Sequence, residues 1–169
     1  VTFMEELILV DSEDREIGQA EKTSVHLGSG RLHRAFSVFI FDDQERLLIQ
    51  QRAQDKMLWP SFWSNSCCSH PRPGEDVVSA AQRRLQEELG FSCQLEHLGS
   101  FIYSAQFNDI GAENELCHVL MGRYNGAVKP DPKEIQDIQW LRLDEIKKMV
   151  AKDSSQWTPW FLMELEKFF

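Results

Sequence analysis

The chain has 169 residues, 42% hydrophobic and 27% charged, which suits one domain with a buried core. Its formal net charge of −9 at pH 7 argues against non-specific binding to nucleic acid, which needs a basic surface. The longest apolar run, AFSVFIF, is far shorter than a membrane span, and no signal-peptide pattern is visible. If its four cysteines are reduced thiols, we expect a cytoplasmic protein without nucleic-acid or membrane partners.

The first part of the chain is typical of strands followed by a long loop. Residues 5–11, EELILVD, predict a strand. Residues 34–43 and 46–53 predict a β-hairpin, because DDQE between the two apolar runs is a turn signal. Residues 53–75 are rich in Trp, Pro, Ser and Cys and predict a loop. Loops of that length inside a compact domain are usually functional.

The second part combines one clear helix with further strands. Residues 76–89, DVVSAAQRRLQEEL, predict a helix with an apolar stripe, and Gly90 is a natural stop. The stripe consists of Val78, Ala81, Leu85 and Leu89. Further strands are predicted at about 93–107, 114–124 and 136–142, and closing helices at 144–151 and 158–169. Because strands outnumber helices without regular alternation, we predict a single α+β domain over residues 1–169.

Five residues are candidate ligands of one metal ion: His26, His33, His70, Glu113 and Glu115. The two glutamates are two positions apart, so on a strand both would point to one face. His26 and His33 flank the turn-prone LGSG, which favours a loop that turns both imidazoles inward. Three imidazoles and two carboxylates suit Mn, Fe, Zn or Co and suit Mg poorly. Taken singly, each histidine also fits a surface or hydrogen-bonded role.

The segment SNSCCSHP, residues 64–71, places Cys67 beside Cys68 and His70 two positions further on. Adjacent α-carbons lie about 3.8 Å apart, so the two thiols are poor partners for a disulfide. In an extended segment, Cys68 and His70 would share one side and Cys67 would face the other. A thiol near an imidazole ionises more readily, which suits a nucleophile or an acid–base group. The alternative is a structural cysteine.

Two further patterns allow a structural or a functional interpretation. In RRLQEELG, Arg83–Glu87 and Arg84–Glu88 are i,i+4 pairs, which could be a solvated helix face stabilised by about 0.2–0.5 kcal/mol per pair. Most of the tryptophans are expected in the core or at its rim, although a tryptophan face can also stabilise a cation. Those considered are Trp59, Trp63, Trp157 and Trp160.

Together these motifs resemble one family, the type I isopentenyl diphosphate isomerases of the Nudix superfamily. The stretches SNSCCSHP, RLHRAFSVFIF, LLIQQRA, RRLQEELG, AENELC and TPW occur in the expected order between about residues 5 and 165. The resemblance implies a Nudix-type mixed β-sheet core flanked by helices. It also implies an enzyme of isoprenoid biosynthesis, whose partner is a small isoprenoid diphosphate. Such enzymes interconvert isopentenyl and dimethylallyl diphosphate by a metal-dependent 1,3-allylic proton shift through a tertiary carbocation.

The Nudix box is matched with two departures. Matching positions are Glu75, Arg83, Leu85, Glu87, Glu88, Gly90 and Phe91. Ser69 replaces the first Gly, and Arg84 replaces a Glu. A reversed charge in the metal-binding helix disfavours hydrolysis, which needs those carboxylates, and is compatible with an isomerase. A Nudix diphosphohydrolase, a thiol hydrolase using Cys68 and His70, and a non-catalytic metal-binding module remain the alternatives.

The resemblance implies a role for each site residue. Cys68 and Glu115 match the two acid–base groups, with Tyr103 beside Glu115, while Cys67 falls at a variable position. Glu115 is the expected proton donor. Metal ligands are implied at His26, His33, His70, Glu113 and Glu115 for one Mn²⁺ or Zn²⁺, and at Glu88 and the Cys68 carbonyl for Mg²⁺ bound with the diphosphate; no flavin is implied. Substrate-binding positions are implied at Lys22, Arg52, Lys56 and Arg84 for the diphosphate and Trp160 for the isoprenoid.

Overall fold

The computed structural model describes residues 4–169, so residues 1–3 of the predicted domain lie outside the described part. Within that part the chain forms one mixed sheet of nine strands: β1 Glu6–Val10, β2 Glu16–Glu21, β3 His33–Phe41, β4 Arg46–Arg52, β5 Trp63–Ser64, β6 Cys67–Ser69, β7 Leu95–Phe107, β8 Gly111–Arg123 and β9 Ile135–Arg142. Its helices are α1 Lys22–His26, α2 Val77–Leu89, α3 Leu143–Lys152 and α4 Pro159–Phe168. The predicted α+β class is confirmed.

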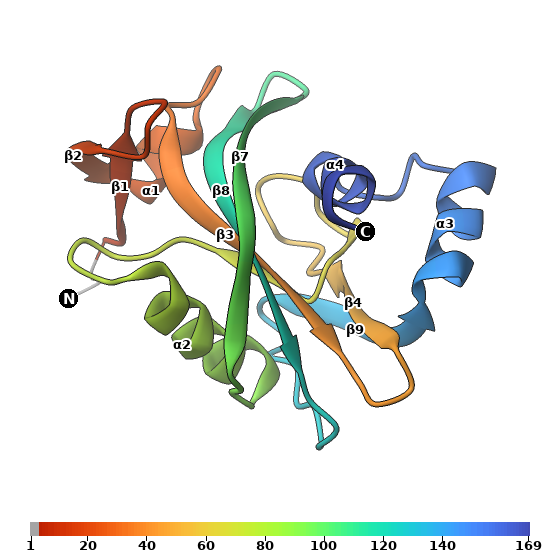
Figure 1. Ribbon diagram of the computed structural model, residues 1–169. Coiled ribbons are helices and arrows are strands. Elements are labelled where there is room, and N and C mark those ends of the chain that lie inside the picture. The colour runs from red at the N-terminus through yellow and green to blue at the C-terminus, as the bar shows by residue number, and fades with distance from the viewer. Residues whose placement is uncertain (1–3) are drawn as a thin grey trace.

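Strand β3 is central to the sheet, because it pairs with β1, β4, β6 and β8. The pairing with β8 is parallel and runs in register from His33↔Glu115 to Phe41↔Arg123. Strand β8 also forms a long antiparallel pair with β7, and the three strands cross the middle of the molecule (Figure 1). Two residues far apart in the sequence, His33 and Glu115, thereby become neighbours.

The predicted hairpin is confirmed at its turn, but its strands then separate. Strands β3 and β4 pair at Phe41↔Leu47, and the Asp42 carboxylate closes the turn by accepting from the Arg46 amide at 2.8 Å. Beyond the turn, β5 pairs with β4 and β6 pairs with β3. Residues 53–75 are therefore not only a loop as predicted, because β5 and β6 lie within them. Pairing with β3 holds Cys67 and Cys68 in an extended conformation.

The hydrophobic core lies in two layers, one on each face of the sheet. Along β3, Phe39 and Phe41 pack with α3 and α4, whereas Phe36, Val38 and Ile40 pack with α2. This alternation is the period of two that an extended strand imposes. Burying each such side chain contributes roughly 1.5–3 kcal/mol. Figure 1 shows α2 on one side of the sheet and α3 and α4 on the other.

The predicted helix at 76–89 is confirmed with both of its ends. Asp76 caps it by accepting a hydrogen bond from the Ser79 amide at 2.9 Å. Gly90 ends it in the left-handed conformation, with φ at 77°. Strand β2 and the one-turn helix α1 were not predicted. No helix within residues 4–169 has the length and apolar character needed to cross a bilayer.

Candidate active site

Every predicted site residue except His33 lines one pocket, which is bordered by α1, β6, α2, α4 and the segment at 55–58. These residues are Lys22, His26, Arg52, Lys56, Cys68, His70, Arg84, Glu88, Tyr103, Glu113, Glu115 and Trp160. His33 is fully buried beneath them. The structure therefore gathers residues from Lys22 to Trp160 at one place.

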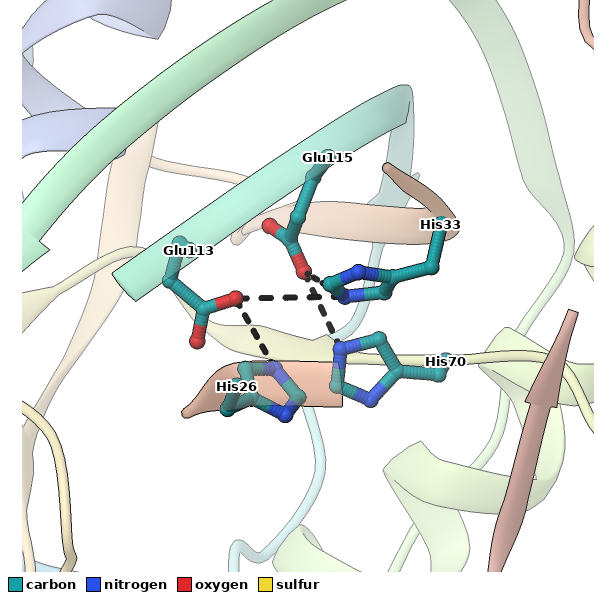
Figure 2. Close-up of side chains that lie close together, drawn as sticks. All are labelled: His26, His33, His70, Glu113 and Glu115. Carbon is teal, nitrogen blue, oxygen red and sulfur yellow. Dashed lines mark hydrogen bonds and ion pairs between the residues drawn. The ribbon is translucent and has the colours of Figure 1, made fainter. Parts of the chain in front are cut away.

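Three imidazoles and two carboxylates converge at this pocket (Figure 2). They are supplied by the end of α1, the start of β3, the residue after β6 and two alternate positions of β8: His26, His33, His70, Glu113 and Glu115. One ligand atom from each lies within 4.8 Å of the others. The register of β3 and β8 sets His33 beside Glu115, with 3.3 Å between Nε2 and Oε2.

Main-chain carbonyls fix which ring nitrogen is free in two of these histidines. His26 Nδ1 donates to the Lys22 carbonyl at 2.7 Å, and His33 Nδ1 donates to the Arg31 carbonyl at 2.8 Å. In the neutral form of each ring, Nε2 therefore offers a lone pair, and each Nε2 faces a carboxylate oxygen of β8, at 3.1 and 3.3 Å. Facing lone pairs repel unless a proton or a cation lies between them. This is the arrangement that outer hydrogen bonds create around metal-binding histidines.

Buried atoms without partners also fit a cation at this place. Within residues 4–169, His33 Nε2 and His70 Nδ1 are buried and accept or donate no hydrogen bond. Buried polar atoms are normally paired, and a metal ion would satisfy His33 Nε2. The donor set of imidazole nitrogens and carboxylate oxygens suits a divalent transition metal. The cluster can therefore hold a divalent metal ion.

The pKa values of the cluster residues are shifted, because these titratable groups are buried close together. Burial opposes the charged form of His26, but the hydrogen bond and charge of Glu113 outweigh it and raise the pKa of His26 to about 9. Burial lowers the pKa of His70 to about 3. Burial and the charge of Glu115 raise the pKa of Glu113. Burial acts to raise the pKa of Glu115, but its close interactions with His33 and His70 hold it well below its usual range.

Cys67 and Cys68 point to opposite faces of β6, as the sequence predicted. The Cys68 thiol donates to Asn65 Oδ1 at 2.9 Å and borders the pocket. The Cys67 thiol turns toward α2 and donates to Glu88 Oε2 at 2.7 Å. Only Cys68 is therefore placed to meet a molecule in the pocket.

The alternative of a thiol ionised by His70 is not supported. His70 Nε2 interacts with Glu115 at 3.0 Å, and the described residues show no hydrogen bond between His70 and Cys68. Burial raises the pKa of the Cys68 thiol. Cys68 is thus a neutral thiol in this environment, not a preformed thiolate nucleophile.

Aromatic residues form another part of the pocket. The Tyr103 hydroxyl donates a hydrogen bond to Glu115 Oε1. The Trp160 indole donates to Ser64 Oγ at 3.0 Å, which fixes the plane of its ring. The Arg52 guanidinium lies 5.3 Å from the centre of that ring. A cation can therefore be held against this aromatic surface.

Cationic side chains line the pocket near α2. Arg84 pairs with Glu88 at 2.8 Å and lies 3.6 Å from Glu134, and Lys56 also pairs with Glu134. Burial acts to raise the pKa of Glu134, but the charges of Lys56 and Arg84 outweigh it and lower the pKa. The side chains of Arg84 and Glu88 are only 15% and 6% exposed, so the solvated-face interpretation is wrong for this pair.

Several residues around the site were missed by the sequence analysis: Ser37, Asn65, Glu134 and Glu164. Ser37 had a signal, because it interrupts an otherwise apolar run on β3. Asn65 lies in the conspicuous SNSCCSHP stretch, but its contacts depend on β3. Glu134 and Glu164 had no signal, because a glutamate in a charged loop or an amphipathic helix is normally exposed.

Comparisons with known proteins agree with this architecture. A NUDIX domain is matched over residues 31–161. The DR0079 protein of Deinococcus radiodurans has a similar fold, with a TM-score of 0.80, 22% identity, and coverage of 98% of this chain and all of that one. The family match over residues 31–161 shows that the chain contains a Nudix domain.

Sequence relatives narrow the class. The isopentenyl-diphosphate Delta-isomerase of Burkholderia multivorans is 44% identical over 163 residues, covering 96% of this chain and 92% of the relative. That of Serratia proteamaculans is 46% identical over 158 residues, covering 94% and 88%. The chain belongs to the isopentenyl-diphosphate Delta-isomerase family, within the Nudix superfamily.

Proposed function

We propose that this protein interconverts isopentenyl diphosphate and dimethylallyl diphosphate, the activity that the names of its relatives imply. The observation that carries the proposal is one pocket that combines two proton-transfer groups, Cys68 and Glu115, with four cationic side chains. A 1,3-proton shift in a diphosphate needs the proton-transfer groups for the alkene and the cationic side chains for the diphosphate. We also propose that residues 1–169 act as one cytoplasmic domain, which suits the free thiols of its four cysteines.

The diphosphate is bound by the cationic part of the pocket: Lys22, Arg52, Lys56 and Arg84. Glu88 and the Cys68 carbonyl would hold a Mg²⁺ ion that accompanies the diphosphate, and Mg²⁺ commonly binds through few protein ligands plus phosphate oxygens. In the structure, Arg84 and Lys56 interact with Glu134, so bound phosphate oxygens would share these cations with that carboxylate. The negative net charge of the whole chain does not prevent this local attraction.

Chemistry takes place at the alkene. A proton added to the terminal alkene carbon produces a tertiary carbocation, and loss of a proton from the carbon that follows the diphosphate-bearing methylene produces the isomer. One of Cys68 and Glu115 begins protonated and the other ionised, and the transfer exchanges these forms, so protons balance. The Tyr103 hydroxyl, bonded to Glu115, supports the charge on that carboxyl. That Glu115 is the first donor stays a prediction, and it requires the reverse of the neutral Cys68 and ionised Glu115 described above.

The carbocation must survive between the two transfers. The Trp160 ring, which already faces the Arg52 guanidinium, offers π-electron density to a positive carbon. Met57, Leu58, Tyr103 and Trp160 form the apolar and aromatic part of the pocket, where less water would be available to capture the cation. Cys68 is a buried neutral thiol and not a stray nucleophile.

The His/Glu cluster would hold one Mn²⁺ or Zn²⁺ through the three imidazoles and two carboxylates. When bound, such an ion supplies positive charge that stabilises ionised Glu115 and fixes its carboxyl group. Of the five ligands, Glu115 alone also contacts Tyr103. It therefore links the metal cluster to the reacting part of the pocket.

Incubation with isopentenyl diphosphate and Mg²⁺ in D₂O tests the function. We expect dimethylallyl diphosphate with deuterium in the methyl group formed from the alkene terminus, without release of phosphate or diphosphate, as followed by NMR. Phosphate release without deuterium incorporation would favour a diphosphohydrolase instead. No reaction from metal-loaded protein would favour a binding module.

A further inference from the structure

A chain of buried polar groups runs from Cys68 to helix α4. Cys68 Sγ lies 3.5 Å from Ser37 Oγ, which lies 3.4 Å from Cys117 Sγ. Cys117 Sγ lies 3.8 Å from Glu164 Oε1. These distances are within the range of weak hydrogen bonds to sulfur. Glu164 is fully buried, does not line the pocket and has no place in the reaction described above.

Asn65 sets the direction in which this chain donates. Its amide nitrogen donates to two main-chain carbonyls at 3.1 Å each, so its Oδ1 must be the acceptor. The Cys68 thiol therefore donates its hydrogen bond to Asn65 Oδ1, and its sulfur can accept a hydrogen bond from the Ser37 hydroxyl. The Ser37 oxygen can then accept from the Cys117 thiol. The Cys117 thiol is placed to donate either to Ser37 Oγ or to Glu164 Oε1. When its proton goes to Ser37, its sulfur is left to accept from a donor beside it.

Glu164 can be that donor only as an uncharged acid. Burial raises the pKa of the Glu164 carboxyl well above its usual range, which favours the uncharged acid. Its Oε2 has no hydrogen-bond partner within residues 4–169, as expected if no full charge has to be neutralised there. A protonated Oε1 completes a run of donors from Glu164 to Asn65.

Helix α4 also reaches Cys68 from the opposite direction. Trp160 lies one turn before Glu164, and its indole donates to Ser64 Oγ at 3.0 Å. Ser64 Oγ in turn donates to Asn65 Oδ1 at 2.9 Å. The Cys68 thiol is therefore held between two polar connections that both begin on the buried face of α4.

We propose that Glu164 is a positioning residue, which holds the Cys68 thiol through Cys117 and Ser37 in the orientation that proton exchange with the substrate requires. The inference rests on the proposed function, in which Cys68 is one of the two proton-transfer groups. It adds a hydrogen-bonding residue that never contacts the substrate. Because its task is to donate and accept hydrogen bonds, a neutral amide of the same size can replace it.

The test compares Glu164→Gln, which keeps neutral hydrogen-bonding groups, with Glu164→Met, which keeps length and removes them. Glu166→Gln and Glu166→Met on the exposed face of the same helix are matched controls. For each variant, kcat, KM for isopentenyl diphosphate and melting temperature are measured. The rate at which iodoacetamide alkylates Cys68 is followed by mass spectrometry, with Cys93 as internal reference.

We expect Glu164→Met to lower kcat about tenfold or more at unchanged KM, as a misplaced reacting group does. Its Cys68 alkylation rate should change while that of Cys93 does not, and Glu164→Gln should retain most of both properties. Wild-type kcat in Glu164→Met, or equal losses in Glu164→Gln, would overturn the proposal. If the wild-type protein did not isomerise the substrate, the proposed function would fail, and the alkylation rates would still decide whether Glu164 positions Cys68.

Discussion

Tyr103 and Glu115 are register partners in the antiparallel β7–β8 pair, and the Tyr103 hydroxyl donates a hydrogen bond to Glu115 Oε1. A hydrogen bond to a charged group is worth about 1.5–3 kcal/mol. We therefore predict that Tyr103→Phe lowers kcat by about ten- to a hundredfold while its buried ring keeps the fold. The other tyrosine provides the control, because the Tyr124 hydroxyl donates to the Ala127 carbonyl and Tyr124 does not line the pocket formed by the described residues. Equal kinetics for Tyr103→Phe and Tyr124→Phe would contradict the role.

Loss of two imidazoles should empty the metal cluster. We predict that His33→Ala lowers metal content and activity together, and that His33→Ala with His70→Ala abolishes stoichiometric metal. The reason is that the remaining donors cannot complete the coordination of one ion. Metal per chain is measured by plasma mass spectrometry on folded protein, with His97→Ala outside the cluster as control. Full metal occupancy in the double variant would contradict the assignment of this cluster as the metal site.

Metal removal should also destabilise the fold, because it leaves the carboxylates of Glu113 and Glu115 close together and buried. A ligand at a hundred times its Kd stabilises the native state by about 2.7 kcal/mol. We expect chelation to lower the melting temperature of the wild-type protein by several degrees. The double histidine variant should respond less, and an equal response of the two proteins would count against a bound ion.

The adjacent cysteines should differ strongly in their effect. We predict that Cys68→Ala loses about two to four orders of magnitude in kcat, the usual contribution of an acid–base group. Cys67→Ala should keep most of the rate, because Cys67 faces α2 and contacts the pocket only through Glu88. An epoxide analogue of the substrate should alkylate Cys68. Losses of equal size in the two variants would argue against this division.

Glu88 should control the response to Mg²⁺. It is buried and accepts hydrogen bonds from Cys67 and Arg84, so Glu88→Gln keeps its size but not its charge. We predict that this variant needs more Mg²⁺ to reach half of its maximal rate. Glu87→Gln is the control, because Glu87 is the more exposed neighbour on the same helix. Normal kinetics of Glu88→Gln at limiting Mg²⁺ would show that the role is wrong.

The sequence predicted those helices and strands whose start, stop and periodicity signals lie within the segment itself. Helix α2 has both its cap at Asp76 and its stop at Gly90, so its bounds could be predicted closely. Strand β2 has no run of apolar alternation, and α1 is a single turn, so neither gave a periodic signal. Strand β6 forms because β3 offers it a free edge, which no stretch of local sequence records.

In the site, too, features set by local sequence were predicted, whereas features set by long-range packing were not. Alternation along an extended chain predicted that Cys68 and Cys67 face opposite sides, and that Glu113 and Glu115 face the same side. The thiol–imidazole pair that the sequence left open did not form, because His70 meets Glu115, which lies 45 positions away. The buried positions of Glu88 and Glu164 depend on how helices pack on the sheet, and a single sequence contains no record of that packing.

Because β3 pairs with the distant strand β8, the residues of the His/Glu cluster become available at different times during chain synthesis. His26 and Glu113 are separated by 87 positions, and all three histidines precede both carboxylates. A nascent chain that ends before β8 therefore contains every imidazole and neither glutamate of the cluster. Contacts between such distant segments form late, because a long loop must close first. A metal ion held by all five side chains could therefore be captured only after β8 has been made and paired with β3.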